Sequence, residues 1–412
     1  MTRNDQFVQQ CSADKAVSPF VRDKFLRRKL WAARAGFFTG GFTVASWAPI
    51  IPFVQKELML EPAVLGALLF GLGIGSFVGM PLAGAISRQI GSRNAIAVSG
   101  LSSCLLLVIL AMIPGFYIEC AALFLYGITL GCLEVSVNIY GASLEKEVGS
   151  PVMSGLHAAY SIGEVLSAGA VTAMLVTGMP LLVAIGALML VLSVMLMTSL
   201  RGVPNTYSSD HGAGHSFVSF APPRGRILVI ALLCMAVFLA EGAMLDWSAI
   251  YIHSIGGIEM SAAGLGYTLF VMAMAISRLG GDYMVNRFGA ARVLYVGLLM
   301  NIGTLVAMVV YPQPIVLFIC LFVMGLGMAN VAPVLISAAA SIKGLDATAA
   351  ITTVTTVGYG GLMAGPALLG FIAQHWSLQT ALGFVAVLLS VSLINHLLET
   401  HRKAPAAVVV RK

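Results

Sequence analysis

The sequence predicts an all-α integral membrane protein with twelve transmembrane helices in two six-helix halves. Of its 412 residues, 59% are hydrophobic and only 10% are charged, whereas a soluble domain is about 45–50% apolar and about 25% charged. The charged residues gather in short segments between long apolar runs, and one long polar segment, residues 201–226, divides those runs equally. Such a chain cannot present a charged surface to water over its whole exterior.

Twelve apolar runs are long enough to cross a bilayer, which takes about 20 residues of α-helix. They start near Leu30, Ala63, Ala95, Ile118, Met153, Pro180, Ile227, Ala262, Val293, Ile315, Ala349 and Leu378. We therefore expect a cytoplasmic tail (1–29), a first half (30–200), a cytoplasmic linker (201–226), a second half (227–399) and a cytoplasmic tail (400–412). The first segment has no signal-peptide apolar core, so the first run should be a retained helix.

Basic residues in the connectors predict the orientation. One side of the membrane receives Arg27, Arg28, Lys29, Arg88, Arg93, Lys146, Arg201, Arg224, Arg287, Arg292, Lys343, Arg402 and Lys403. The other side receives only Lys56. By the positive-inside rule the basic side is cytoplasmic, so both termini should be cytoplasmic. The net charge of +6 then reflects orientation, and we expect no nucleic-acid partner.

The linker, residues 201–226, is rich in Gly, Pro and Ser, which suits a tether between two packed halves. A long loop within a single bundle is the alternative. A repeat favours two halves, because the segments GAISRQIGSR (84–93) and DYMVNRFGAAR (282–292) follow the second and the eighth runs. Both place an Arg, a Gly and another Arg in the same order, as expected of an internal duplication.

These connectors resemble the loop signature of the major facilitator superfamily, G-x-x-x-D-R-x-G-R-R. The Asp of that signature is Arg88 in the first copy and Asn286 in the second, although Arg287 and Gly289 are kept. In that family the Asp helps to latch the cytoplasmic ends of the halves, so the resemblance implies an altered latch. The gating residues expected here are Arg88, Arg93, Arg278, Asn286 and Arg287, with Arg278 tying the eighth helix to the connector beneath it.

Five shorter stretches resemble the YbjJ-type inner-membrane transporters, which are similar in turn to the fucose permease group. They are ASWAPIIP (45–52), EVSVN (134–138), LHAAYSIG (156–163), EGAMLDW (241–247) and GYGGLMAGPALLG (358–370). The fucose permeases carry a Glu and an Asn four residues apart in the fourth span, which Glu134 and Asn138 match. The resemblance implies a bacterial inner-membrane location and a role for Glu134 in proton coupling. The fucose permeases also carry a carboxylate in span one, whereas residues 36–54 of this chain contain none.

Charged residues inside the spans are the strongest functional signal, because inserting a charged side chain at the centre of a membrane helix costs about 2.5–3.5 kcal/mol of free energy. Four carboxyl groups fall well inside predicted spans, at Glu134, Glu164, Glu241 and Asp246. Each needs a cationic partner, a water-filled cavity or a proton. We expect Glu134, Glu241 and Glu164 to couple protons; carboxyl groups neutralised for structural reasons are the alternative.

Residues near these carboxyl groups are candidates for binding substrate. Asn138 lies one helical turn from Glu134, and His157 and Tyr160 share a helical face with Glu164. These groups could contact a polar solute or form a closed hydrogen-bond network.

Four further candidates for binding substrate lie nearer the ends of the spans, and Asp246 is one of them. Trp47 and Trp247 could stack on a ligand or anchor the protein at the membrane interface. Arg34 could bind an anionic substrate or extend to the cytoplasmic interface.

The sequence thus predicts a secondary active transporter that moves a small polar solute by alternating access, driven by protons. Proton-driven efflux of amphipathic compounds, or a sensor that has lost transport, are the alternatives. No P-loop, HExxH or GxSxG motif is present, so we expect neither an enzyme nor an ATP-driven pump. The six cysteines form no metal or redox motif, and we expect no metal or cofactor and a monomer in the bilayer.

Overall fold

The computed structural model describes the backbone of residues 19–148, 152–201, 203, 205, 224–342, 344–345 and 347–402. All regular elements in this described part of the chain are helices. Twelve helical segments among these residues are long and apolar enough to cross a membrane. The predicted all-α membrane class with twelve spans is therefore confirmed.

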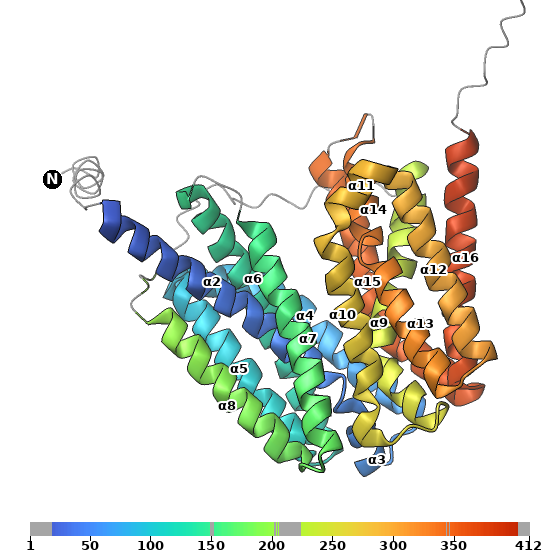
Figure 1. Ribbon diagram of the computed structural model, residues 1–412, viewed down its shortest axis with the longest axis horizontal. Coiled ribbons are helices and arrows are strands. Elements are labelled where there is room, and N and C mark those ends of the chain that lie inside the picture. Colours follow the sequence, from blue (N-terminus) through green and yellow to red (C-terminus); the bar gives the residue numbers. More distant parts are fainter. Residues whose placement is uncertain are drawn as a thin grey trace, which may run out of the picture.

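The first group of helices contains α2 (Pro19–Trp47), α3 (Ile51–Glu57), α4 (Pro62–Ile90), α5 (Ser92–Met112), α6 (Phe116–Val148), α7 (Met153–Val176) and α8 (Leu181–Leu200). The second contains α9 (Arg226–Ser254), the 3-10 turn η1 (Met260–Ala262), α10 (Gly264–Leu279), α11 (Gly281–Phe288), α12 (Ala290–Val310), α13 (Pro314–Met328), α14 (Val331–Ala340), α15 (Ala347–His375) and α16 (Leu378–Arg402). Figure 1 shows the two groups side by side.

Two helix boundaries differ from the sequence-based expectation. Helix α2 begins at Pro19, ahead of the predicted start at Leu30, because a helix can continue beyond the bilayer where exposed side chains such as Arg27 reach water. The tenth span is not one continuous helix, since a turn at Ala329 and Asn330 separates α13 from α14. The side chain of Asn330 stabilises this break by donating to the carbonyl oxygen of Ser277 at 3.3 Å.

The two connectors recognised as a repeat have the same backbone conformation. Gly91 links α4 to α5 with φ 83° and ψ 155°, and Gly289 links α11 to α12 with φ 86° and ψ 144°. A positive φ is available to glycine without the steric cost that a Cβ atom would bring. The repeat seen in the sequence therefore corresponds to a repeated turn.

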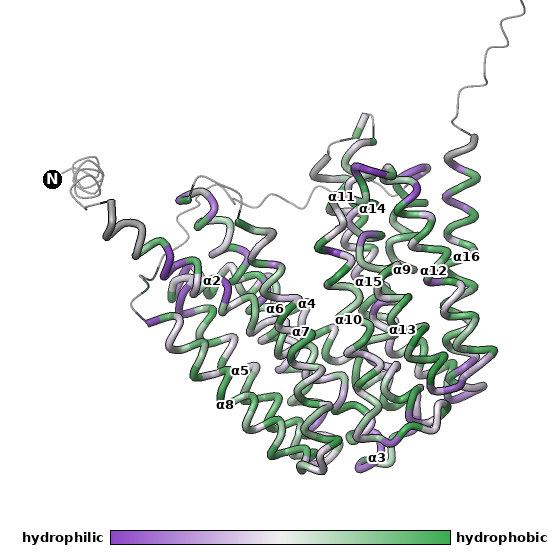
Figure 2. Tube along the Cα trace, in the orientation of Figure 1, coloured by the Kyte–Doolittle hydropathy of each residue, from purple (hydrophilic) through white to green (hydrophobic). Residues whose placement is uncertain are grey.

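The two groups of helices meet at one end of the bundle, the end that carries α3, and lie apart at the end that carries α11 and the start of α2 (Figure 1). Gly66 of α4 packs against the backbone of Pro366 and Gly370 of α15, and Gly264 of α10 packs against Pro49 and the Thr172 side chain of α7. Small residues allow this close backbone approach. Hydrophobic residues cover most of the span lengths, whereas hydrophilic segments gather towards helix ends (Figure 2).

Candidate functional site

A cavity of about 470 Å³ lies between the two groups of helices. Its lining residues are Met80, Glu134, Val135, Asn138, Ile139, Ala142 and Tyr359. Helix α6 supplies most of the wall, α4 supplies Met80, and α15 of the opposite group supplies Tyr359. The cavity therefore touches both groups of helices.

Glu134 and Asn138 lie on the same wall, but their side chains do not pair with each other. The Asn138 Nδ2 atom donates to the backbone oxygen of Glu134 at 2.8 Å. No hydrogen bond or ion pair joins the Glu134 carboxyl group to another described residue. The helix backbone thus orients the amide, and the carboxyl group remains available to the cavity.

The structure brings the three predicted proton-coupling residues together from three helices. Glu164 of α7 interacts electrostatically with both Glu134 of α6 and Glu241 of α9. Arg278 of α10 lies beside Glu241, with its Nη2 atom 3.7 Å from Glu241 Oε1. It also interacts electrostatically with Glu164 across the interface between the groups.

The position of Arg278 differs from the sequence-based expectation. We expected it to tie its helix to the connector beneath it, but its guanidinium group reaches α9 instead. The physical reason is that a charged group inside a membrane span is stabilised by an opposite charge on a neighbouring span, and the Glu241 carboxylate provides one.

Tyrosine residues surround this cluster. Tyr160 interacts electrostatically with Glu134, Glu164, Tyr267 and Tyr359. Its ring packs over Gly40 of α2, where an added Cβ atom would lie 3.2 Å from Cε2. Tyr267, Tyr359 and Met80 were not predicted from the sequence; the signal available for the tyrosines was a hydroxyl group inside an otherwise apolar span.

His157 and Arg34 lie nearer the open end than the carboxyl cluster. His157 packs edge-on against Phe37, with ring centroids 5.1 Å apart, and interacts electrostatically with Arg278. Arg34 is exposed, with its guanidinium carbon 5.5 Å from the ring centroid of Trp31 on its own helix. Arg34 does not line the central cavity.

Trp47, Trp247 and Asp246 are packed inside the protein near the closed end. Both indole rings are 1% exposed, and no described residue accepts a hydrogen bond from either N–H group. In this conformation the rings therefore contact neither lipid headgroups nor a ligand in the central cavity. Asp246 is 8% exposed and interacts electrostatically with Tyr267, which connects it to the carboxyl cluster from the closed side.

The connector residues expected to act in gating do not bridge the two groups in this structure. Arg93 donates from Nη1 to the backbone oxygen of Val203 at 3.0 Å, in the first residues of the linker. The side chains of Arg88, Asn286 and Arg287 are exposed, and no hydrogen bond or ion pair within the described ranges links them to the opposite group. At this open end the two groups are too far apart for a latch.

A polar latch does bridge the two groups at the closed end, and it was not predicted. Gln374 of α15 donates from Nε2 to Glu61 Oε2 at 2.6 Å, and its Oε1 atom accepts from Ala63 N at 3.0 Å. Glu61 and Gln374 lie at opposite ends of the sequence and next to ordinary helix termini. Nothing local in the sequence marks them as partners.

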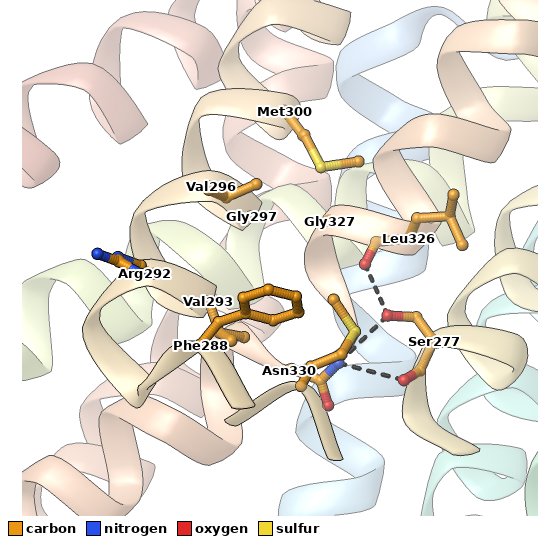
Figure 3. A pocket seen from close by; sticks show the side chains of 11 residues that line it. Ser277, Phe288, Arg292, Val293, Val296, Gly297, Met300, Leu326, Gly327 and Asn330 are labelled. Carbon is orange, nitrogen blue, oxygen red and sulfur yellow. Dashed lines mark hydrogen bonds between the residues drawn. The ribbon is translucent and has the colours of Figure 1, made fainter. Parts of the chain in front are cut away.

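A second cavity of about 260 Å³ lies within the second group of helices, among α10 to α13 (Figure 3). Ser277 donates to the backbone oxygen of Leu326 at 2.9 Å, and Asn330 donates to Ser277 Oγ at 3.2 Å. These polar groups satisfy one another, and none of the lining residues carries a carboxyl group. The cavity is therefore separate from the carboxyl cluster.

Comparison with known proteins agrees with this architecture. A family model described as Major Facilitator Superfamily matches residues 30–259 and 247–411. An uncharacterized MFS-type transporter of Yersinia pestis is 38% identical over 359 residues, which is 87% of this chain and 92% of the relative.

Solved structures share the fold at low identity. A mutant of the nucleoside transporter NupG aligns with a TM-score of 0.74 and 14% identity, covering 92% of this chain and 100% of that chain. A bacterial homolog of the human lysosomal transporter Spinster, inward-facing and unoccupied, aligns with a TM-score of 0.69 and 15% identity, covering 95% and 100%. The chain therefore belongs to the Major Facilitator Superfamily, and it is a multi-pass membrane transporter rather than an enzyme.

Proposed function

We propose that this protein is a secondary active transporter that moves a small polar solute across the bacterial inner membrane by alternating access, coupled to protons. The observation that carries the proposal is the cluster of Glu134, Glu164 and Glu241, in which Arg278 serves the last two, beside a cavity between the two groups of helices. The groups of helices act as two halves, and both termini are cytoplasmic. The resemblance to the YbjJ-type transporters and the fucose permease group supports the same assignment.

The shape of the bundle supports alternating access. The halves are joined at the end that carries α3 and separated at the end where the basic connectors lie (Figure 1). If the basic connectors are cytoplasmic, this conformation is inward-open, the state named for the Spinster homolog. Closure would bring Arg88 and Arg93 toward Asn286 and Arg287, where they act as the cytoplasmic gate.

Proton coupling follows from the charge in the cluster. When the halves close around an empty cavity, unpaired carboxylates lose water and become unfavourable. Protons at Glu134, Glu164 and Glu241 remove that cost, so a proton gradient can drive the change of access. Asn138 and Tyr160 contribute polar contacts for the solute beside the carboxyl groups, and His157 contributes one nearer the open end.

Efflux of amphipathic compounds is the second candidate. It is favoured by the apolar share of the cavity wall, which contains Met80, Val135, Ile139 and Ala142 beside the polar residues. A thermal-shift screen of polar metabolites against lipophilic compounds separates the two, because a ligand that binds the native state raises its apparent stability.

The direct test is uptake into proteoliposomes with an imposed pH gradient. Using a solute identified in that screen, at a concentration that saturates each variant, Glu134→Gln should lose gradient-driven accumulation but keep counterflow, because exchange of solute needs no net proton movement. Glu57→Gln, an exposed carboxylate on α3, is the matched control. Full gradient-driven accumulation by Glu134→Gln would exclude Glu134 as the coupling residue, and binding without any counterflow would indicate a sensor.

A further inference from the structure

The wall of the central cavity offers hydrogen-bond acceptors and an aromatic ring, and none of its lining residues is basic. Asn138 uses one N–H of its amide on the helix backbone, which leaves its carbonyl oxygen for the cavity. Tyr359, which also lines the cavity, offers its hydroxyl group and an aromatic ring. Glu134 offers two carboxyl oxygens, and a carboxylate accepts hydrogen bonds only.

Glu134 is also the member of the carboxyl cluster without a cation of its own. Arg278 lies 3.7 Å from Glu241 and interacts electrostatically with Glu164, so one guanidinium group serves these two carboxyl groups. With all three ionised, the cluster contains three carboxylates and one guanidinium group, which leaves two negative charges uncompensated. A charge in this position needs either a proton or a bound cation.

We infer that the substrate is an organic cation, a small solute whose ammonium group pairs with Glu134 and lies against the ring of Tyr359. This inference rests on the transport function proposed above. An ammonium group donates hydrogen bonds that the carboxylate and the Asn138 oxygen can accept, and the face of an aromatic ring attracts a cation. Met80 and Ile139 then contact the apolar part of the solute.

An anionic substrate lacks the corresponding contacts. Arg34 suggested such a substrate in the sequence, but it packs beside Trp31 on its own helix and is absent from the cavity wall. Arg278 is already shared between carboxyl groups. An added carboxylate in this cavity would meet Glu134 as a like charge.

The test compares solutes that share a scaffold and differ in charge. Glucosamine, glucose and gluconate form one set, and cyclohexylamine, cyclohexanol and cyclohexanecarboxylate form another. Binding to the purified full-length protein is measured by calorimetry at neutral pH, and exchange is measured by counterflow in proteoliposomes. At least one amine should bind about tenfold tighter than its neutral partner, since one charge interaction of this kind is worth that factor, and the carboxylates should not bind.

Two substitutions assign the effect to the cavity. Glu134→Gln should reduce the preference for the amine over its neutral partner to near one, whereas Glu57→Gln should leave it unchanged. Tyr359→Phe keeps the aromatic face and should retain most of the amine affinity, while Tyr359→Leu should lower it several-fold.

Other outcomes separate this inference from the proposed function. If neutral solutes bind and exchange as well as the amines, or if neither amine binds at millimolar concentration while another solute is exchanged, the cation inference is wrong and transport stands. If Glu134→Gln lowers the affinities for the amine and for its neutral partner equally, the inference is also overturned, because Glu134 then contributes to binding without regard to the charge of the solute. If the protein binds solutes but exchanges none, the transport function itself fails.

Discussion

Gln374 on α15 donates a hydrogen bond to Glu61, the residue before α4, over 2.6 Å and thereby joins the two halves at the closed end of the bundle. The same side chain accepts a hydrogen bond from the backbone N–H of Ala63. These contacts link residues on opposite halves, so they must break whenever this end opens. The closed end is therefore held by a polar latch that can be weakened without changing the cavity.

We predict that Gln374→Glu favours opening of this end, because it places a second carboxylate beside Glu61. Because both side chains are exposed, losing this hydrogen bond costs only about 1 kcal/mol, which corresponds to roughly a fivefold change in the population of the closed state. Labelling of an Ala63→Cys probe by a membrane-impermeant maleimide should accelerate accordingly. Gln374→Met, which removes the hydrogen bonds without adding charge, should give a smaller increase, and equal labelling in all variants would show that the latch has no influence.

Gly66 provides a second test of the closed end. An added Cβ atom there would overlap the backbone oxygen of Pro366 on α15, whereas Gly71 of the same helix has no neighbouring atom within 4 Å of such a Cβ. We therefore predict that Gly66→Ala keeps the halves apart at this end and lowers transport several-fold. Gly71→Ala should transport normally. Comparable transport by the two variants would contradict close packing of α4 on α15 during the cycle.

The Arg278 and Glu241 pair should be visible in a double-mutant cycle. Arg278→Gln leaves Glu241 and Glu164 without their shared cation, and Glu241→Gln removes one of its partners. Because both side chains are partly exposed, we expect a coupling energy of only about 1 kcal/mol in the free energy of unfolding. Thermal unfolding of the two single variants and the double variant measures it, and additive effects would show that the pair is not coupled.

The buried side chain of Glu119 leads to a further prediction, about the thermal stability of the protein. It lies in the first turn of α6, is 0% exposed, and neither carboxyl oxygen has a hydrogen-bond partner among the described residues. Burying an unpartnered polar group costs roughly 1–3 kcal/mol by mutational measures. Glu119→Met, which keeps similar length, should therefore raise the melting temperature by a few degrees. A lower melting temperature would indicate a partner at this site, and reduced transport with unchanged stability would assign Glu119 to the cycle.

Much of the fold was predictable from the sequence, because a bilayer imposes simple rules on local composition. A helix must be apolar for about 20 residues to cross it, and this alone located the starts of α4, α7 and α16 within a residue or two. The turns at Gly91 and Gly289 were also predictable, since a glycine repeated at matching positions indicates the same backbone conformation in both places. The start of α2 was missed because polarity ends a membrane span without ending a helix.

Only part of the candidate site could be predicted from the sequence. The cost of a charge in the membrane marked Glu134, Glu164 and Glu241 one by one, since that cost is a property of each residue and its span. Tyr359 and Gln374 carry no charge, so this cost did not identify them, and the hydroxyl group of Tyr359 was only a weak signal. A tyrosine near a glycine-rich helix turn and a glutamine near a helix end are ordinary until another helix is placed beside them.

The sequence by itself therefore determined the number of spans, the internal repeat and the list of costly charges, because each depends on residues that are close together along the chain. Only the tertiary structure decided that Arg278 serves Glu241 and Glu164, that Trp47 and Trp247 are packed away from the cavity, and that Gln374 meets Glu61. These pairings join helices far apart in the sequence. They follow from how the two halves pack, which the periodicity of any single helix does not encode.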